Sequence, residues 1–233
     1  MTPDPAQRQM LRISDMFAVA CGMAQMADCA VLNAELRTLF LARAGEGRTY
    51  SNPRPLTQRN PQTFESHFDL FRWREPCVQR LKAFCWGHLL NFVGALQGYD
   101  RATCDRLLIY NDAWFHVMRR GAFFGLHNHP MASWSGVYSV HTDPSDADKP
   151  DSGLLCFVNP CLTGAMYMDS ANDKLRPPFD TGIRTYRLEP GQLLLFPSWL
   201  LHDVKPYEGD GERITVAFNC WFSMPAPGAT AAS

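Results

Sequence analysis

From about Arg106 onwards, the chain is a series of short β-rich runs separated by loops rich in glycine, proline and aspartate. Several short strands with turns between them favour a β-sandwich or a barrel. The sequence therefore predicts a β core for this half of the chain. The expected strands are residues 107–110, 114–118, 123–127, 135–140, 154–158, 186–188, 192–196 and 214–221.

The N-terminal half has the spacing of helices. Apolar residues recur at helical intervals over residues 29–42, and this pattern ends at Gly45. A second helix is expected to begin near Pro76, because proline suits the first turn, and to end at Gly98. The apolar faces of these helices need a sheet to cover, so we expect a single domain. Its parts would be a mainly helical support (1–105), the β core (106–222) and a flexible tail (223–233).

Composition excludes several classes of protein. The 233 residues are 46% hydrophobic, which is ordinary for a globular core and argues against general disorder. The net charge of −1 gives no electrostatic reason to expect nucleic acid or a membrane as partner. The sequence shows neither a secretory leader nor an apolar run of about 20 residues. We therefore expect a cytoplasmic protein.

The eight cysteines include no C-x-x-C pair, which disfavours a redox motif or a zinc ribbon. Most of them stand among apolar residues, as Cys85 and Cys220 do. We expect buried free thiols that act as small hydrophobic side chains.

Two histidines, His127 and His129, are separated by a single residue and followed by Pro130. Residues two apart on a strand point to the same face, so both imidazoles can reach one point. Neutral imidazole suits iron, copper, nickel and zinc. The alternative is a chance H-x-H in which either histidine is simply exposed.

A third histidine follows an apolar run. Residues 193–196 end at Pro197, which cannot donate to a central ladder and so marks a strand end or a bulge. A short turn then leads to His202. Residues at the mouths of barrels are well placed to form sites. As a third imidazole, His202 would complete a ligand set and leave other positions open.

Residues 213–221 alternate strictly between two faces. The even-numbered face is apolar and is expected to pack against helices, whereas the odd-numbered face is small and polar, with Arg213 at its mouth. An arginine that faces a cavity needs an anion, because an unpaired buried charge is very costly. Its guanidinium can hold a carboxylate through two parallel hydrogen bonds. We expect such a clamp, with His202 on the partner strand of the same hairpin. The alternative is a surface salt bridge to Glu212 or Asp210.

These motifs occur in the order H-x-H, F-P-S-W-L-x-H and a final-strand arginine, which resembles the iron(II)- and 2-oxoglutarate-dependent oxygenases. The closer resemblance is to a branch of small bacterial and phage members. In that branch a strand containing tryptophan precedes H-N-H-P and then S-G-V-Y. This chain has Trp114, H-N-H-P at 127–130 and S-G-V-Y at 135–138. The resemblance covers about residues 106–222.

The resemblance implies a mainly β fold with N-terminal helices, namely a double-stranded β-helix (a cupin-like jelly roll) flanked by helices. The catalytic core would be the jelly roll. The implied cofactors are Fe(II), with His127 and His202 as ligands, and 2-oxoglutarate, whose far carboxylate would be held by Arg213.

The resemblance also suggests lining residues for the pocket. Ser135, Tyr138 and Asn219 are expected near the cosubstrate, although strand parity prevents Ser135 and Tyr138 from both pointing inward. Trp114 is expected to form a wall of the pocket. His116 would share its face of the strand and could touch the substrate.

The chain departs from the broad superfamily at His129, where H-x-D or H-x-E is usual. Three neutral imidazoles would leave Fe(II) with its full double positive charge, so the site should bind anions more strongly. Ligand spacing favours a centre of three histidines, His127, His129 and His202. The alternative is that His129 does not ligate and that Asp143 or His141 takes its place.

The expected activity is O2-dependent hydroxylation of an unactivated C–H bond in a small metabolite, amino acid or peptide, with release of succinate and CO2. One alternative is a three-histidine iron dioxygenase that acts without 2-oxoglutarate and uses Arg213 to bind its substrate. Another is a catalytically inactive jelly-roll binding protein. Oxygen uptake that depends on 2-oxoglutarate separates the first two, and the absence of Fe(II) binding would favour the third. No oligomeric state is predicted.

Overall fold

The computed structural model describes residues 13–14, 16–160 and 167–225. Most of its strands follow one another in the second half of the chain, as the sequence predicts. They are β3 (Leu108–Met118), β4 (Phe124–His127), β5 (Trp134–Thr142), β6 (Leu155–Phe157), β7 (Arg184–Tyr186), β8 (Gln192–Pro197), β9 (His202–Val204) and β10 (Arg213–Ser223). Two further strands, β1 (Gly22–Gln25) and β2 (Thr63–Glu65), come from the N-terminal half.

The strands from β3 to β10 are divided between two antiparallel sheets. One has the order β1-β8-β5-β10-β3-β2 and the other β4-β9-β6-β7. Apolar side chains of β6 pack against those of β8, so the two sheets face each other across a shared interior. Strands that alternate between two such sheets form a jelly roll. The predicted fold class, mainly β with N-terminal helices and a double-stranded β-helix, is confirmed.

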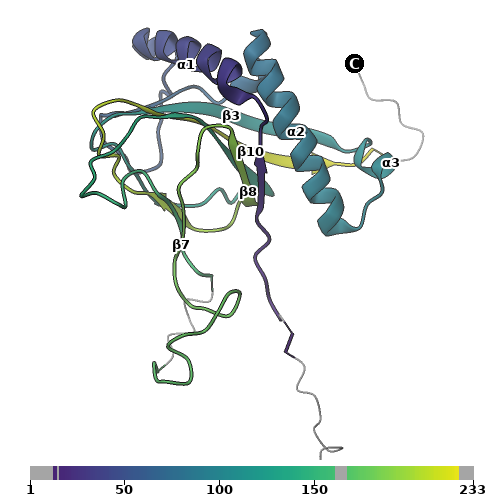
Figure 1. Cartoon of the computed structure of the whole chain (residues 1–233). Coiled ribbons are helices and arrows are strands. Elements are labelled where there is room, and N and C mark those ends of the chain that lie inside the picture. The colour runs from purple at the N-terminus through teal and green to yellow at the C-terminus, as the bar shows by residue number, and fades with distance from the viewer. Residues whose placement is uncertain (1–12, 15, 161–166, 226–233) are drawn as a thin grey trace, which may run out of the picture.

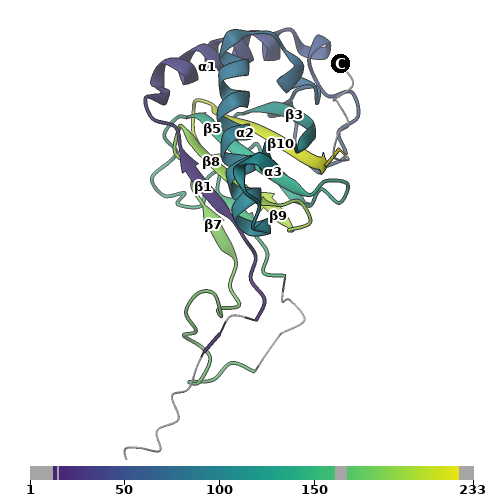
Figure 2. The same cartoon turned by 90° about the vertical axis from the view of Figure 1, so that its right-hand side faces the viewer.

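Two long helices, α1 (Cys29–Gly45) and α2 (Pro76–Gln97), cover the outer face of the six-stranded sheet (Figures 1 and 2). Pro76 lies in the first turn of α2, and Gly98 ends it with a φ of 69°, in the left-handed region that favours glycine. Both predicted helices are confirmed. The short helix α3 (Arg101–Cys104) follows, and 3-10 turns lie at Gly47–Thr49 and Leu70–Arg72.

The main hydrophobic core lies between these helices and the sheet. Phe218 of β10 is fully buried there, and its ring centroid lies 5.1 Å from that of Trp86 and 5.7 Å from that of Phe71. Across the sheet, a Cβ on Gly136 of β5 would lie 2.2 Å from Cζ of Phe218. Because Trp86 of helix α2 packs on this ring, the ring cannot move away from β5, and only glycine fits at position 136.

The boundaries of some strands differ from prediction. Residues 107–110 and 114–118 are not two strands: Asn111 and Asp112 stay paired with Cys220 and Asn219, so β3 runs unbroken. Both residues are typical of turns, but Asp112 lies on the strand face that lines a pocket, where polar residues are tolerated, and Asn111 is only half-buried. β7 ends at Tyr186 instead of beginning there. The short strands β1, β2 and β9 were not predicted.

His202 and Arg213 do not share a hairpin, and that prediction is wrong. β9 pairs with β4 and β6 in the four-stranded sheet, whereas β10 pairs with β3 and β5 in the other. The connection between them, residues 205–212, crosses from one sheet to the other. The two residues therefore approach the interior of the jelly roll from opposite sides.

Of the described cysteines, none forms a disulfide; five are buried, Cys29 is half-buried and Cys21 is exposed. Cys161 lies outside the described residues. Helices in the described part of the chain are all too short or too polar to cross a membrane. The division into one domain with the predicted boundaries stays a prediction.

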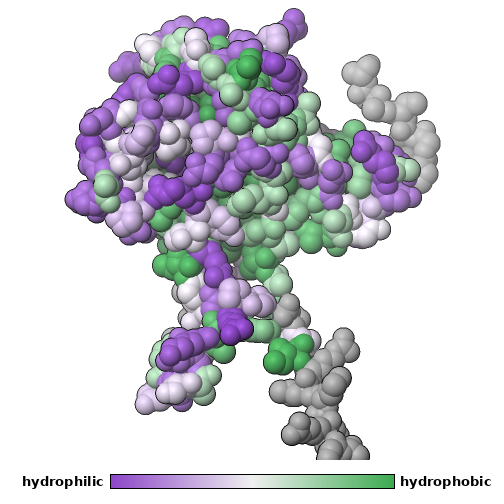
Figure 3. Space-filling model, in the orientation of Figure 1, coloured by the Kyte–Doolittle hydropathy of each residue, from purple (hydrophilic) through white to green (hydrophobic). Residues whose placement is uncertain are grey.

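Away from the core, the chain leaves the body in two places. Residues 16–21 and 167–183 extend beyond the sheets (Figures 1 and 2). In the space-filling view, hydrophobic residues gather on the lower part of the body and hydrophilic ones on its left side (Figure 3).

Candidate active site

A pocket of about 770 Å³ opens between the two sheets. The six-stranded sheet lines one wall with the inward faces of β3, β5 and β10. The four-stranded sheet lines the other with residues of β4, β6 and β9. This is the interior of the jelly roll, where the fold brings strands that are distant in sequence together.

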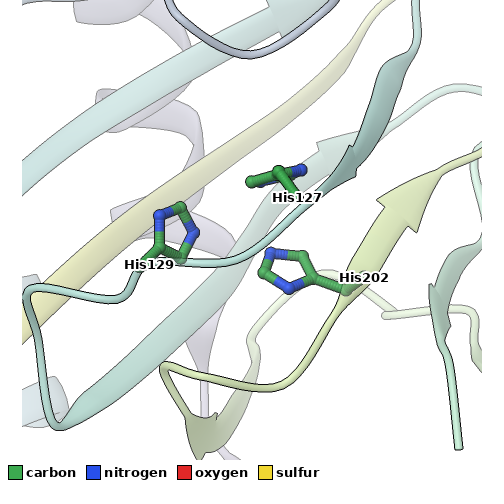
Figure 4. Close-up of side chains that lie close together, drawn as sticks. All are labelled: His127, His129 and His202. Atoms are coloured by element: carbon green, nitrogen blue, oxygen red, sulfur yellow. The ribbon is translucent and has the colours of Figure 1, made fainter.

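Three histidines meet at this pocket (Figure 4). His127 is the last residue of β4 and His202 the first of β9, and the two are direct cross-strand partners. Their ring centroids are 4.3 Å apart, and that of His129 lies 5.1 Å from His127 and 5.2 Å from His202. One nitrogen from each ring lies within 4.8 Å of the other two. The sequence predicted this convergence, and the structure shows it.

Backbone contacts orient the rings. Nδ1 of His127 donates to the carbonyl oxygen of Gly125 at 2.7 Å, and Nδ1 of His202 donates to that of Leu200 at 2.8 Å. A carbonyl only accepts, so Nδ1 carries the proton and Nε2 keeps a free lone pair. The segment that carries His129 is tied down as well, because its backbone N–H donates to the carbonyl of Ser198 at 2.8 Å.

The three imidazoles are neutral at pH 7. Burial lowers the pKa of His127, and it lowers that of His129 to about 3 and that of His202 to about 4, with mutual repulsion adding to the effect for the latter two. Neutral imidazoles on rings already oriented by hydrogen bonds are suitable ligands for a transition metal.

Arg213 lies at the inner end of the pocket and is 6% exposed. Nη1 donates to Sδ of Met118 at 3.3 Å, and no acidic side chain in the described parts of the chain forms an ion pair with the guanidinium. Burial lowers its pKa to about 10. The alternative salt bridge is not found: Glu212 pairs with Arg37 at 3.0 Å and Asp210 with Arg120 at 2.8 Å. Arg213 is thus a buried cation that faces a cavity and has no counter-charge among the described residues.

Ser135 and Asn219 line the pocket, and their contact with the cosubstrate stays a prediction. The Ser135 hydroxyl donates to Oδ1 of Asn219 at 2.7 Å, so its oxygen accepts the Ser198 hydroxyl at 2.8 Å. Tyr138 does not line the pocket, and that prediction is wrong. Its parity is opposite to that of Ser135, so its side chain packs under the helices and donates to Oδ1 of Asn33 at 2.8 Å.

Trp114 and His116 share the pocket face of β3. Nε2 of His116 lies 2.8 Å from the indole Nε1 of Trp114. Burial lowers the pKa of His116, which is therefore neutral. Glu65 lies beside it at 3.2 Å. Burial would raise the pKa of Glu65, but contacts with His116, Asn52 and Arg59 bring it down to about 2.

The alternative ligands His141 and Asp143 lie elsewhere. Nε2 of His141 is 3.0 Å from Oδ1 of Asp143, and neither residue lines the pocket. His141 lies near the end of β5, and Asp143 follows the strand. Neither can replace His129 in the cluster.

Sequence reasoning missed several lining residues. Asp112 is two residues before Trp114 on the same strand face, so the period of a strand would have found it if β3 had been predicted as continuous. Glu65 and Phe68 come from a distant segment laid along β3. No local signal in the sequence marks them.

Residues 112–219 match a family model described as "Putative 2OG-Fe(II) oxygenase". This segment begins on β3 and ends on β10, and so contains the histidine cluster and Arg213. This segment is similar to the core of the 2OG-Fe(II) oxygenases, a class of oxidoreductases whose cofactors are Fe(II) and 2-oxoglutarate.

Solved structures of similar fold include a prolyl-4-hydroxylase from Pseudomonas putida, with a TM-score of 0.55 at 19% identity over 88% of this chain and 94% of that one. AviO1 from Streptomyces viridochromogenes has a TM-score of 0.53 at 16% identity, covering 91% and 93%. HygX from Streptomyces hygroscopicus, solved with nickel, 2-oxoglutarate and hygromycin B, has a TM-score of 0.52 at 13% identity, covering 87% and 82%. Among curated proteins, no sequence matches the chain. At these identities, the structures show a shared fold.

The residues of this oxygenase fit its cofactors by their chemistry. Three neutral imidazoles with free lone pairs suit a divalent transition metal. A buried guanidinium that pairs with no carboxylate of residues 16–160 or 167–225 suits one end of a dicarboxylate such as 2-oxoglutarate.

Proposed function

We propose that this oxygenase hydroxylates a C–H bond of a small metabolite, amino acid or peptide and releases succinate and CO2. One observation carries this proposal: a single pocket contains both a cluster of three neutral imidazoles and a buried arginine that no carboxylate of the described residues pairs with. A metal and a dicarboxylate would satisfy these two features together.

In this proposal His127, His129 and His202 hold Fe(II), and Arg213 holds the far carboxylate of 2-oxoglutarate. When bound, Fe(II) and 2-oxoglutarate would supply the electrons that activate O2 for attack on a C–H bond. The chain itself orients these groups and keeps water away. Arg213 fixes the position of the cosubstrate, and Trp114, which is 5% exposed, closes the wall beside His129 with its ring centroid 6.0 Å away.

Ser135 and Asn219 are proposed to set the polarity of the cosubstrate wall. The chain of hydrogen bonds from Ser198 through Ser135 ends on Oδ1 of Asn219, so the Asn219 amide group is held in one orientation. Nδ2 of Asn219 then remains as a donor on the pocket face of β10.

The cluster has no carboxylate member, so bound Fe(II) would keep its full double positive charge. The centre should therefore bind anions more strongly than one with a carboxylate ligand. Arg213 adds a further positive charge to the same pocket. Together they favour a doubly negative cosubstrate over a neutral one.

The proposal is tested by adding Fe(II) and then 2-oxoglutarate to the metal-free protein without oxygen. We expect stoichiometric iron binding and a visible charge-transfer band that appears only with the cosubstrate. A flat visible spectrum with iron bound would contradict the proposal. Oxygen uptake that needs no 2-oxoglutarate would indicate instead a dioxygenase that binds its substrate directly.

The role of His129 is tested separately by calorimetric titration of Fe(II). His129→Ala should weaken iron binding at least tenfold, and His129→Asp should restore much of it because a carboxylate is also a ligand for iron. His141→Ala is the matched control, since His141 lies outside the pocket. Undiminished iron binding in His129→Ala, or a loss in His141→Ala, would refute the assignment of three histidines.

A further inference from the structure

The pocket of this oxygenase has opposite charges at its two ends. On paired strands β3 and β10, Arg213 is opposite Met118 at the inner end, and Asp112 is opposite Asn219 nearer the mouth. Six residues separate these two levels on each strand, which is roughly 20 Å at about 3.3 Å per residue. Trp114, which lies beside His129 of the histidine cluster, is at a level between them. Arg213 and Asp112 thus lie on either side of the cluster along the strands.

Within the part of the chain that the structure describes, the side chain of Asp112 has no partner. No hydrogen bond or ion pair reaches its side chain from any residue of 16–160 or 167–225. The other carboxylate that lines the pocket, Glu65, is already occupied by Asn52 at 2.7 Å and by Arg59 at 2.8 Å. A half-buried carboxylate that lines a pocket and has no counter-charge is available for a cation from outside.

Aromatic rings stand close to Asp112 at the mouth. Trp221 and Phe68 both line the pocket, and they are 38% and 42% exposed. Trp221 follows Asn219 on the same face of β10 and stacks on Tyr110 with centroids 6.3 Å apart. Phe68 packs on Trp114 at 4.5 Å. An ammonium or guanidinium group is attracted both by a carboxylate and by the faces of such rings.

We propose that the Asp112 end of the pocket binds a positively charged nitrogen of the substrate, an ammonium or a guanidinium group, between the carboxylate and the aromatic rings of Trp221 and Phe68. This inference rests on the proposed function only for the claim that the ligand is the substrate. The rim beyond the rings is apolar, with Leu56 at 98% and Met131 at 90% exposure, so the cation would be carried by an aliphatic chain or ring. When the cationic group of the ligand is bound at Asp112, its neighbouring carbon atoms would lie towards the histidine cluster.

One charged residue could oppose this preference. Arg54 also lines the pocket and is exposed, and its side chain forms no ion pair within the described residues. If the charge of Arg54 determined which ligands bind at the mouth of the pocket, the mouth would bind an anion more tightly than a cation. The charge preference of the mouth therefore distinguishes the two residues directly.

The experiment uses three probes that differ only in their end group: hexylamine, hexan-1-ol and hexanoate. Their dissociation constants are measured at pH 7 by ligand-observed NMR titration of the metal-free protein, so the result does not depend on iron or on turnover. We expect the wild type to bind hexylamine, which is protonated at this pH, about tenfold more tightly than hexan-1-ol. Agmatine, which carries a guanidinium, should compete with hexylamine.

Asp112→Asn removes the charge with little change in shape. In this variant the dissociation constants of hexylamine and hexan-1-ol should be about equal. Trp221→Leu should reduce the preference for hexylamine over hexan-1-ol, measured as the ratio of their dissociation constants, about threefold. Asp148→Asn, which alters an exposed carboxylate outside the pocket, is the matched control and should leave it unchanged. Thermal melting of each variant checks that the fold is kept.

The proposal is overturned if the wild type shows no preference for hexylamine over hexan-1-ol, or if Asp112→Asn keeps the preference. Failure of the proposed function would be seen elsewhere, as the absence of the anaerobic charge-transfer band. The two experiments use different ends of the pocket and different ligands. Each can therefore fail without the other.

Discussion

Strands β3 and β10 have one face that packs against the helices and another that lines the pocket. On the helix side, Ile214, Val216 and Phe218 are completely buried in the main core. On the pocket side, the neighbouring residues of the same strand are Arg213, Thr215 and Asn219, which are polar or charged. Because side chains alternate between the two faces of a strand, successive residues contribute in turn to the stability of the core and to the pocket.

This contrast has an energetic consequence. A residue on the helix face contributes by filling space and excluding water, so a truncation there leaves a cavity. A residue on the pocket face has solvent or ligand beside it and is not needed to fill the core. Substitutions one residue apart on β10 should therefore affect different measurements.

The largest effect is expected on the helix face. Phe218→Ala should lower the free energy of unfolding by about 3–5 kcal/mol, because it leaves a cavity among Trp86, Phe71 and Gly136. Urea denaturation followed by far-UV circular dichroism measures this loss. The matched variant Thr215→Val, on the opposite face of the same strand, should change stability by no more than about 1 kcal/mol. Equal losses in both variants would refute the separation of the two faces.

The next effect is expected on the pocket face. Arg213→Lys keeps the charge but loses the planar fork, so the dissociation constant of 2-oxoglutarate should rise about tenfold while stability is unchanged. Anaerobic titration of the iron-loaded protein measures the binding. Arg120→Lys is the control, because Arg120 pairs with Asp146 and Asp210 outside the pocket. A large loss of stability in Arg213→Lys with unchanged affinity would assign Arg213 to the core instead.

The two faces also explain what the sequence could predict. The alternation in residues 213–221 was assigned correctly because it is local and repeats every two residues, and the three histidines were found because their motifs are short. The sheet to which β9 belongs could not be inferred, since residues 205–212 can close a hairpin or cross between sheets. Glu65 and Phe68 reach the pocket through pairing with a distant strand, which no local pattern records.

Tyr138 shows most clearly what a sequence motif cannot predict. Its S-G-V-Y motif lies close to the site, but its side chain points away from the pocket. The sequence determines that Ser135 and Tyr138 face opposite ways, but packing decides which of them faces the pocket. Gly136 shares the parity of Tyr138 and lies against Phe218 of the main core, which directs Tyr138 to the helices. Ser135 is thereby left to face the pocket.

The smallest effect is expected for Tyr138→Phe, which removes only the hydroxyl that donates to Oδ1 of buried Asn33 at 2.8 Å. Loss of this hydrogen bond should lower the free energy of unfolding by about 1 kcal/mol and leave the affinity for 2-oxoglutarate unchanged. Ser135→Ala is the matched variant on the same strand: it should weaken cosubstrate binding, because Ser135 holds the Asn219 side chain in place. If Tyr138→Phe instead weakened cosubstrate binding with stability intact, the helix-facing position of Tyr138 would be refuted. The pair of variants thus tests, with one hydroxyl on each face of β5, whether parity alone decides which residues serve the pocket.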